Sequence, residues 1–388
     1  MIDDPVAGFE YCIPTRLIFE HGGAAKLGGL LKRFGYKSAF LVIDPGFHAA
    51  GLDADLLRSL DESGIGYTIF TDVEPNPIDT SMERGADEFK GRRDDVVLGI
   101  GGGSAMDSAK AVAVLATNAG RLRDYDGNDR VPNDAWPLML IPTTAGTGSE
   151  ANYNLSVTNA DTKEKMAVRS VRNCACVALL DPSLLKNLPE HVAAAAGYDA
   201  LVHAVESYVS NRSTAPTRMI ALEAVRRIAP ALEPFVADRA DSSSAGEMLY
   251  AASLAGMVIS HTGTGAAHAV ARALGGRYNV VHGVATGVLL EPVMRFNLEA
   301  AQRRYAEVGD ALAVTTPAMD ERQRAEAALR RIAAMRGNIG LPERLPITVD
   351  AKYERELAEW ASRSAGPNPR KVSADDARRL MYEVVSHA

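Results

Sequence analysis

Asp199 and His203 are four residues apart in a segment with the apolar spacing of a helix, and His268 and His282 follow downstream. Side chains at positions i and i+4 of a helix project from one face, so Asp199 and His203 can bind one ion. One carboxylate and three imidazoles form an oxygen and nitrogen site that suits Fe(II), Zn(II), Ni(II) or Mn(II). A metal held by such ligands, with one position left open, can polarise a substrate oxygen.

The same residues also have simpler explanations. An aspartate and a histidine one turn apart often form a pair on a helix surface. His268 lies in a run of small residues, where a histidine is often only packed and hydrogen-bonded. By spacing alone, a metal site and a set of structural histidines are both open.

A second segment has the pattern of a phosphate-binding loop. Residues 96–100 are a short apolar run typical of a buried strand, the loop Gly101–Ser104 follows, and residues 105–115 have a helical pattern. A glycine turn between strand and helix lets the backbone approach a phosphate, which the N–H groups of the helix start can bind. Ser104 replaces the last glycine of the usual dinucleotide fingerprint, and no P-loop sequence is present, so a tight turn without a ligand also fits.

A third segment repeats this arrangement. Residues 138–142 are apolar, and a loop with four hydroxyl side chains follows: Thr143, Thr144, Thr147 and Ser149. Open α/β sheets bind ligands at the carboxyl ends of their strands, although turn chemistry alone also explains such residues. Two loops of this kind in one α/β half favour a bound dinucleotide.

An aspartate at the end of an early strand bears on the choice of cofactor. Asp44 ends the apolar run 38–43 and precedes Pro45 and Gly46. A carboxylate at such a place can hydrogen-bond a ribose hydroxyl and repels a 2′-phosphate, which favours NAD over NADP. The alternative is that Asp44 only caps the turn that follows.

These motifs occur together in the order and spacing of a known family. Over nearly its whole length the chain resembles the iron-containing (group III) alcohol dehydrogenases. The segments that carry the resemblance are 14–23, 74–77, 101–110, 142–150, 196–206, 281–284 and Gly366–Arg370. The resemblance places the four metal-ligand positions of the family on Asp199, His203, His268 and His282.

The resemblance also implies NAD as cofactor, with Fe(II) as the first candidate metal and Zn(II) as the second. We add Asp107 and Ser149 to the cofactor-contact positions that it implies, because both lie in the same two motifs. The candidate cofactor residues are Asp44, Asn76, Gly101, Gly102, Gly103, Ser104, Asp107, Thr143, Thr144, Thr147, Ser149 and Lys165.

The chain departs from the family four residues after the third ligand. Many members have a second histidine there, often assigned to proton transfer, and this chain has Arg272. An arginine stays charged and cannot act as a general base. Arg272 follows His268 by one helical turn, so we expect it at the substrate cavity, where its fork suits a carboxylate or phosphonate. Pairing of Arg272 with a protein carboxylate away from the cavity is the alternative.

The expected reaction is a reversible hydride transfer between NAD(H) and a primary alcohol or its aldehyde, with an anionic end on the substrate. Two other activities stay open: a metal- and NAD-dependent lyase or cyclase of the same fold acting on a phosphorylated sugar acid, and a polyol dehydrogenase. A non-catalytic scaffold or sensor is a third alternative, which the intact ligand positions argue against.

The elements that must position these residues divide the chain in two. Short apolar runs alternate with helical segments up to residue 184, which predicts a parallel α/β sheet that binds NAD. Residues 185–388 are expected to form an all-α domain that holds the metal. Within it, the serine-rich segment 238–245 is expected to be a loop. The resemblance implies a fold similar to that of dehydroquinate synthase.

Composition excludes several classes of protein. A net charge of −7 argues against a nucleic-acid partner, and no apolar run of the length of a membrane span is present. Three cysteines, without a disulfide pattern, suit a reducing compartment. We therefore expect a cytoplasmic enzyme that acts on a small molecule, and the resemblance implies a homodimer or larger homo-oligomer.

Overall fold

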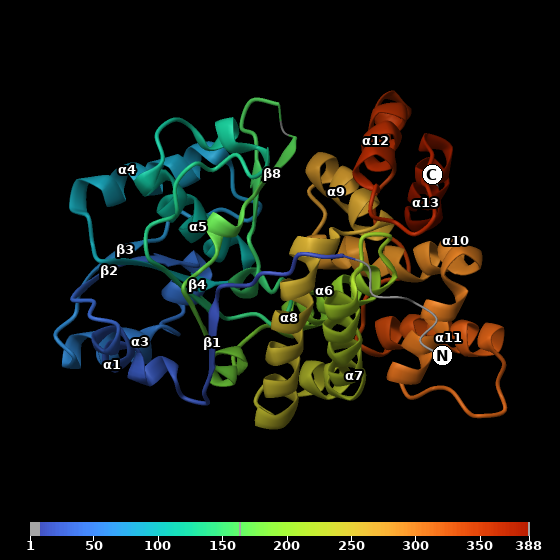
Figure 1. Cartoon of the computed structure of the whole chain (residues 1–388), viewed down its shortest axis with the longest axis horizontal. Coiled ribbons are helices and arrows are strands. Elements are labelled where there is room, and N and C mark those ends of the chain that lie inside the picture. Colours follow the sequence, from blue (N-terminus) through green and yellow to red (C-terminus); the bar gives the residue numbers. More distant parts are fainter. Residues whose placement is uncertain (1–7, 163, 387–388) are drawn as a thin grey trace. The chain divides into compact units, whose positions relative to one another are not determined.

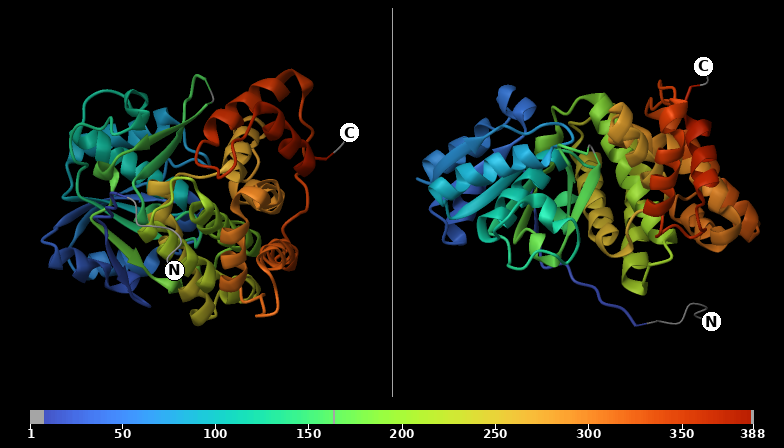
Figure 2. Two further views of the ribbon diagram at one scale, coloured as in Figure 1. Left: turned by 45° about the vertical axis from the view of Figure 1, so that its right-hand side comes forward. Right: turned by 90° about the horizontal axis from the view of Figure 1, so that it is seen from above.

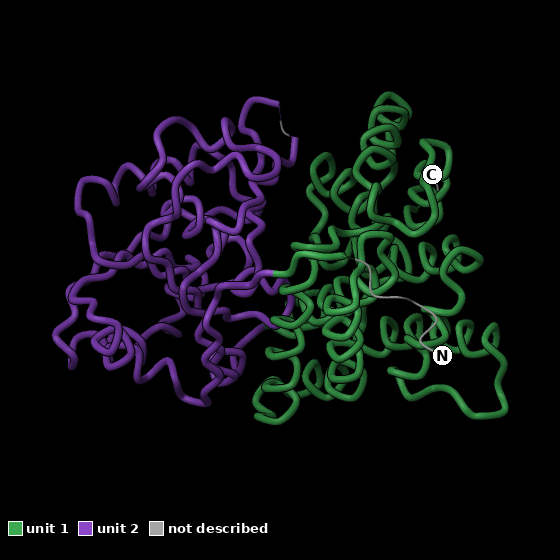
Figure 3. Tube along the Cα trace, in the orientation of Figure 1, with its two compact units in different colours: residues 1–11, 189–388 green, residues 12–188 purple. Residues whose placement is uncertain are grey.

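The computed structural model describes residues 8–162 and 164–386, which form two compact units (Figure 3). One unit comprises residues 12–188. The other begins at Pro189 and also includes the described residues before Cys12. The division falls a few residues after the expected boundary at 184, and the assignment of the N-terminal segment to the helical unit was not expected.

A parallel sheet of six strands forms the core of the unit 12–188, with the order β1-β9-β6-β4-β2-β3. The strands are β1 (Arg16–Phe19), β2 (Ser38–Ile43), β3 (Gly66–Phe70), β4 (Val96–Gly101), β6 (Leu138–Pro142) and β9 (Val177–Leu180). All neighbours pair in parallel. The central strands are buried throughout, as expected of a parallel sheet with both faces covered.

Helices cover both faces of this sheet (Figure 1). On one face lie α1 (Leu27–Arg33) and α3 (Ala54–Glu62), and on the other α4 (Asp79–Arg92) and α5 (Gly103–Thr117). Gly99 in β4 brings α5 close to the sheet, because a Cβ there would lie 2.6 Å from Leu140 Cδ2 and 2.7 Å from Ala109 Cβ. The missing side chain of Gly99 therefore lets α5 pack closely on β4.

A second, smaller sheet was not predicted. It has the order β5-β8-β7 and consists of β5 (Gly127–Asn128), β7 (Asn154–Thr158) and β8 (Lys165–Arg169), with β7 and β8 antiparallel. Its strands are short and half exposed. The α/β unit is thus a parallel sheet with a small mixed sheet added.

The second unit is helical, as predicted. Its helices are α6 (Glu190–Val209), α7 (Ala215–Ala237), α8 (Ser242–Thr262), α9 (Ala266–Tyr278), α10 (His282–Ala311), α11 (Glu321–Asn338), α12 (Ala351–Ser364) and α13 (Ala374–Val384). The central helix is α6, which is buried from Gly197 to Val209 and packs against α7, α8 and α10. The predicted fold class, an α/β domain followed by an all-α domain, is therefore confirmed.

Two further features complete the helical unit. The C-terminal helices pack as a pair, and α12 also packs against α9 (Figure 2). At the other end of the chain, the ring of Tyr11 lies 4.5 Å from that of His261 in α8, which ties the N-terminal segment to this unit. Within residues 8–162 and 164–386, no helix is long and apolar enough to cross a membrane.

The loop predicted over residues 238–245 is wrong in its second half. Helix α8 begins at Ser242, and the Asp241 side chain accepts hydrogen bonds from Ser243 N and Ser244 N. The serine run is thus the first turn of a capped helix rather than a loop.

Candidate functional site

Three helices of the helical unit bring a carboxylate and imidazoles together. Asp199 lies in α6, His268 in α9 and His282 at the start of α10, and one ligand atom of each lies within 4.8 Å of the others. Asp199 Oδ1 is 3.6 Å from His268 Nε2 and 3.9 Å from His282 Nε2. This is the spacing of groups that can share one cation.

His203, the fourth predicted ligand, lies at the same place. Its Nε2 is 3.9 Å from Asp199 Oδ2, and its ring stacks on that of His268 with the centroids 4.5 Å apart. All four predicted ligand residues therefore converge, although His203 faces the other carboxylate oxygen from the one that faces His268 and His282.

A close approach of two helices makes this convergence possible. A Cβ on Gly283 would lie 2.3 Å from the carbonyl oxygen of Ala195, so only glycine allows α10 to begin directly against α6. Beyond it, Thr286 Oγ1 donates a hydrogen bond of 2.7 Å to Asp199 Oδ1 and orients the carboxylate.

Asp199, His203, His268 and His282 form the cluster. Its electrostatics favour the protonation states in which Asp199 and His268 can bind a metal. Burial by itself raises the pKa of Asp199, but the three histidines and the Thr286 hydroxyl lower it to about 2. Burial, the largest cause, holds the pKa of His268 well below its usual value. A carboxylate and a neutral imidazole are the protonation states that bind a metal.

One ring nitrogen tests whether a metal fits. His268 Nε2 is buried and has no hydrogen-bond partner among residues 8–162 and 164–386. A buried polar atom left without a partner is costly, whereas a lone pair directed at a cation is satisfied. The donor set and this atom together fit a divalent metal.

Glu206 is a residue of the cluster that we did not single out from the sequence. Its Oε2 is 2.7 Å from His268 Nδ1, and its side chain is 4% exposed. Burial raises the pKa of Glu206 to about 7, against hydrogen bonds from Gly265 and Ala267 N–H. The signal was available, because Glu206 follows His203 by three residues and lies on the same helix face.

Arg272 lies in α9, one turn after His268, close enough to the cluster for its charge to lower the pKa values of His268 and Glu206. Its Nη2 donates a hydrogen bond of 3.4 Å to Thr264 Oγ1, and its guanidinium carbon is 6.0 Å from the centre of the Trp360 ring.

The loops predicted to bind the cofactor meet at the carboxyl ends of β2, β4 and β6. Thr143 N donates to Gly101 O at 3.0 Å, and Asp44 N donates to Ile100 O at 2.9 Å. A Cβ on Gly102 would lie 3.4 Å from Thr144 Cγ2, and one on Gly103 would lie 2.9 Å from Thr147 Cγ2. The glycines thus keep bare backbone next to the threonines.

Other predicted cofactor residues flank these loops. Gly101 has a φ of 150°, which glycine adopts readily. Asp44 Oδ1 accepts a hydrogen bond of 2.9 Å from Phe47 N and so caps the short helix α2 (Pro45–Ala49). Lys165 Nζ donates to Asn76 Oδ1 at 3.2 Å, so these two predicted cofactor residues lie next to each other.

Asp107 and Ser149 are used inside the protein. Asp107 accepts hydrogen bonds from Ser149 Oγ at 2.6 Å and Ser156 N at 2.9 Å. The fully buried Lys110 donates to Ser149 Oγ at 2.8 Å and to Asn154 O at 2.7 Å, and burial lowers its pKa. These bonds tie the threonine loop to α5. Cofactor binding through the side chains of Asp107 and Ser149 stays a prediction.

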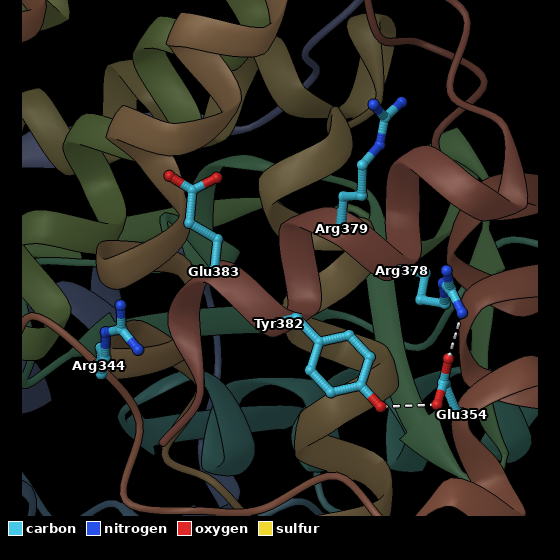
Figure 4. A pocket seen from close by; sticks show the side chains of 6 residues that line it. All are labelled: Arg344, Glu354, Arg378, Arg379, Tyr382 and Glu383. Carbon is cyan, nitrogen blue, oxygen red and sulfur yellow. Dashed lines mark hydrogen bonds and ion pairs between the residues drawn. The ribbon is translucent and has the colours of Figure 1, made fainter. Parts of the chain in front are cut away.

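A surface pocket lies at α12 and α13 of the helical unit (Figure 4). Its charges are largely paired: Arg378 Nη1 is 3.0 Å from Glu354 Oε1, and the Tyr382 hydroxyl donates to Glu354 Oε2 at 2.6 Å. Its lining, which includes none of the predicted site residues, consists of Arg344, Glu354, Arg378, Arg379, Tyr382 and Glu383.

An α/β unit with glycine and threonine loops at its strand ends, followed by a helical unit that gathers one carboxylate and three imidazoles, is the arrangement of a metal-dependent, dinucleotide-linked oxidoreductase. Residues 14–182 match the family model of the iron-containing alcohol dehydrogenases. Residues 193–385 match the model of the C-terminal domain of the Fe-containing alcohol dehydrogenase family. The chain belongs to the iron-containing alcohol dehydrogenase family.

Individual relatives agree with this assignment. The chain is 36% identical to 1,3-propanediol dehydrogenase of Citrobacter freundii over 381 residues, which cover 97% of this chain and 98% of the relative. A crystal structure of 1,3-propanediol oxidoreductase superposes with a TM-score of 0.93 at 34% identity, covering 97% and 100% of the two chains. Sulfoacetaldehyde reductase from Bifidobacterium kashiwanohense, in complex with NAD+, has a TM-score of 0.89 at 25% identity, covering 98% and 100%. The lyase alternative gains no support from these relatives.

Proposed function

We propose that the protein is an NAD-dependent dehydrogenase that interconverts a primary alcohol and its aldehyde, with Asp199, His203, His268 and His282 as the ligands of one divalent metal. The observation that carries the proposal is the convergence of Asp199, His268 and His282 within 4.8 Å from three different helices. The buried His268 Nε2, which faces Asp199 Oδ1 at 3.6 Å, supports a cation between them.

The metal ion and the residues around it would have different roles in the reaction. A divalent ion at this site supplies Lewis-acid polarisation of the substrate oxygen. Asp199 contributes the one negative charge among the proposed ligands, and Thr286 orients it, so a divalent ion bound there would keep a net positive charge toward the substrate. Fe(II) is the first candidate and Zn(II) the second, because both accept these ligands.

The cofactor would be bound by the loops of the α/β unit. Bound there, NAD would supply the hydride acceptor or donor, and the protein would supply its position and orientation. Helix α5 begins at Gly103 with glycine at its N-cap, so backbone N–H groups of its first turn can bind a pyrophosphate. Thr143, Thr144 and Thr147 lie next to this turn and offer hydroxyl groups.

Asp44 is expected to make the enzyme prefer NAD(H) over NADP(H). Replacing Asp44 with glycine should raise kcat/KM for NADPH relative to NADH, because it removes the charge that repels a 2′-phosphate. Initial rates with the two coenzymes at equal substrate measure this ratio.

The control for this prediction is Asp44→Asn. Asparagine can still accept the hydrogen bond from Phe47 N, so it keeps the cap of α2 while removing the charge. Both variants should shift the ratio in the same direction. A parent enzyme that already prefers NADPH would show that our interpretation of Asp44 is wrong.

We further propose a substrate with an anionic end, bound by Arg272. Arg272 lies beside the proposed metal ligands, which supports this proposal, since a guanidinium fork suits a carboxylate, sulfonate or phosphonate. The similarity to a reductase of sulfoacetaldehyde, which has a sulfonate group, points the same way. A neutral diol is the second candidate, favoured by the similarity to 1,3-propanediol dehydrogenase. A homo-oligomeric state and a cytoplasmic location stay predictions.

Metal reconstitution tests the proposed function. The protein is stripped with a chelator, reloaded without oxygen with Fe(II), Zn(II), Mn(II) or Ni(II), and assayed with NADH against a series of anionic and neutral aldehydes. We expect turnover only in reloaded protein. A protein that binds metal and NADH but turns over no alcohol or aldehyde would contradict the proposal. It would favour the alternative of a non-catalytic scaffold or sensor.

A further inference from the structure

The first turn of α9, which carries His268, is capped by side chains from distant parts of the chain. Gly265 N donates to Glu206 Oε2 at 2.8 Å, and Ala267 N donates to Glu206 Oε1 at 2.7 Å. Ala266 N donates to Asn368 Oδ1 at 3.2 Å. Helix starts are normally capped by the residue that precedes them, and here that residue is a glycine. The position of α9 therefore depends on α6 and on the loop between α12 and α13.

Glu206 also determines which ring nitrogen of His268 carries the proton. Its Oε2 lies 2.7 Å from His268 Nδ1, and both of its carboxyl oxygens already accept backbone N–H groups, which favours the carboxylate form. A carboxylate can only accept, so Nδ1 then carries the proton. The lone pair is then on Nε2, the ring atom that faces Asp199 Oδ1 at 3.6 Å. The hydrogen bond made by one ring nitrogen selects the tautomer with which the other binds a metal.

Gly265 and Asn368 allow this arrangement. A Cβ on Gly265 would lie 2.8 Å from Glu206 Oε1 and 3.1 Å from Asn368 Oδ1, so a side chain there would displace both acceptors. Asn368 is held by a reciprocal pair with Asn297: it accepts from Asn297 Nδ2 at 3.0 Å and donates to Asn297 Oδ1 at 2.7 Å. Glu206, Asn297 and Asn368 are all buried.

We propose that Glu206 is a positioning residue for the metal ligand His268: it fixes the Nδ1–H tautomer and, together with Asn368, the place where α9 begins. The segment Gly366–Arg370, which carried family resemblance but no role, thereby acts on the metal site through Asn368. The inference rests on the proposed function only in that the four ligands bind a metal.

The test is Glu206→Gln, measured by metal affinity instead of activity. Glutamine has one acceptor and one donor where glutamate has two acceptors. It either donates to His268 Nδ1 and moves the proton to Nε2, or leaves Ala267 N–H without its acceptor. We expect Co²⁺ to bind roughly 10–100-fold more weakly than in the parent, measured by competition with a chromophoric chelator. The visible spectrum of bound Co²⁺ should change as well.

The matched control is Glu190→Gln, the same substitution in the first turn of the same helix, where the side chain is 70% exposed. It should bind Co²⁺ like the parent. Melting of the metal-free proteins separates capping from ligand positioning. If Glu206→Gln lowers only the melting temperature and keeps the parent's Co²⁺ affinity and spectrum, Glu206 is merely a helix cap and the proposal is wrong.

Gly265→Ala keeps the test decisive if Glu206→Gln does not fold. The added methyl group pushes the Glu206 carboxylate away while leaving its charge in place, and Co²⁺ affinity should again fall. An unchanged affinity in this variant would overturn the proposal. The proposed function fails separately: a parent that binds Co²⁺ but oxidises no alcohol refutes the dehydrogenase and leaves the role of Glu206 intact.

Discussion

Replacing His282 with alanine is expected to abolish metal retention and turnover together. The side chain is 41% exposed, so its removal should leave the helical unit folded, while Asp199 Oδ1 loses a partner 3.9 Å away. A Lewis acid contributes several kcal/mol of transition-state stabilisation, so kcat/KM should fall by on the order of 10³ or more. Metal content after gel filtration and NADH-linked rates measure the two losses.

The control for this experiment is His191→Ala. His191 is an exposed histidine in the first turn of α6, and Asp199 lies further along the same helix. This variant should keep its metal and its activity, and the free energy of unfolding should change little in either metal-free variant. Full activity in metal-free His282→Ala protein would refute the metal-dependent mechanism.

Replacing Arg272 with alanine is expected to impair charged aldehydes selectively. The loss for an aldehyde with an anionic end should be roughly 2–5 kcal/mol if the ion pair is desolvated, whereas a neutral aldehyde of equal length should be little affected. The expectation follows from the position of Arg272 one turn after His268, with Thr264 and Trp360 beside its guanidinium. Values of kcat/KM for the two aldehydes, in parent and variant, give the free energy of interaction between Arg272 and the anionic end of the substrate.

Two variants sharpen this comparison. Arg272→Lys keeps the charge but loses the fork, so it should recover part of the activity on the anionic substrate. Arg277→Ala removes an exposed arginine of the same helix, which lies over the ring of Tyr353, and should not discriminate between the two aldehydes. Equal effects of Arg272→Ala on both aldehydes would rule out a substrate-binding role.

The strands Ser38–Ile43, Val96–Gly101 and Leu138–Pro142, which were predicted as apolar runs, are buried along nearly their whole length. Residues 96–100 and 138–142 read as unbroken apolar runs because helices cover both sides of the sheet. The edge strand Arg16–Phe19 has only four residues and is half exposed, so its apolar content is too small to identify it. The small sheet of β5, β7 and β8 was missed because its strands pair with each other through contacts that local pattern does not encode.

The serine run shows a different limit. Serine favours both loops and helix starts, because its short side chain hydrogen-bonds nearby backbone. Local composition therefore fits either a loop over 238–245 or a helix that begins within it. Burial of Ser244 and Ala245 against the rest of the unit decides for the helix, and that packing is not visible in the sequence.

For the site, ligand types were easier to predict than the residues that support them. Asp199 and His203 could be paired by helical spacing, whereas His268 and His282 could be added by residue type and family resemblance but by no local spacing. Glu206 and His268 are 62 residues apart, and Ala266 and Asn368 are 102 apart, so no local spacing connects them. The alternatives for Asp44 were both reasonable, and the structure shows the cap on α2 through one of its two oxygens.

The order in which the chain is synthesised has a consequence for how the metal site matures. Residues 12–188 form one compact unit, so a growing chain can fold its whole α/β unit before the first metal ligand, Asp199, is synthesised. His282 completes the ligand set, but Asn368, which fixes the start of α9, is translated well after it. We therefore expect metal insertion to be a late event: nascent chains that end before Asn368 should bind metal weakly even though they contain all four ligands.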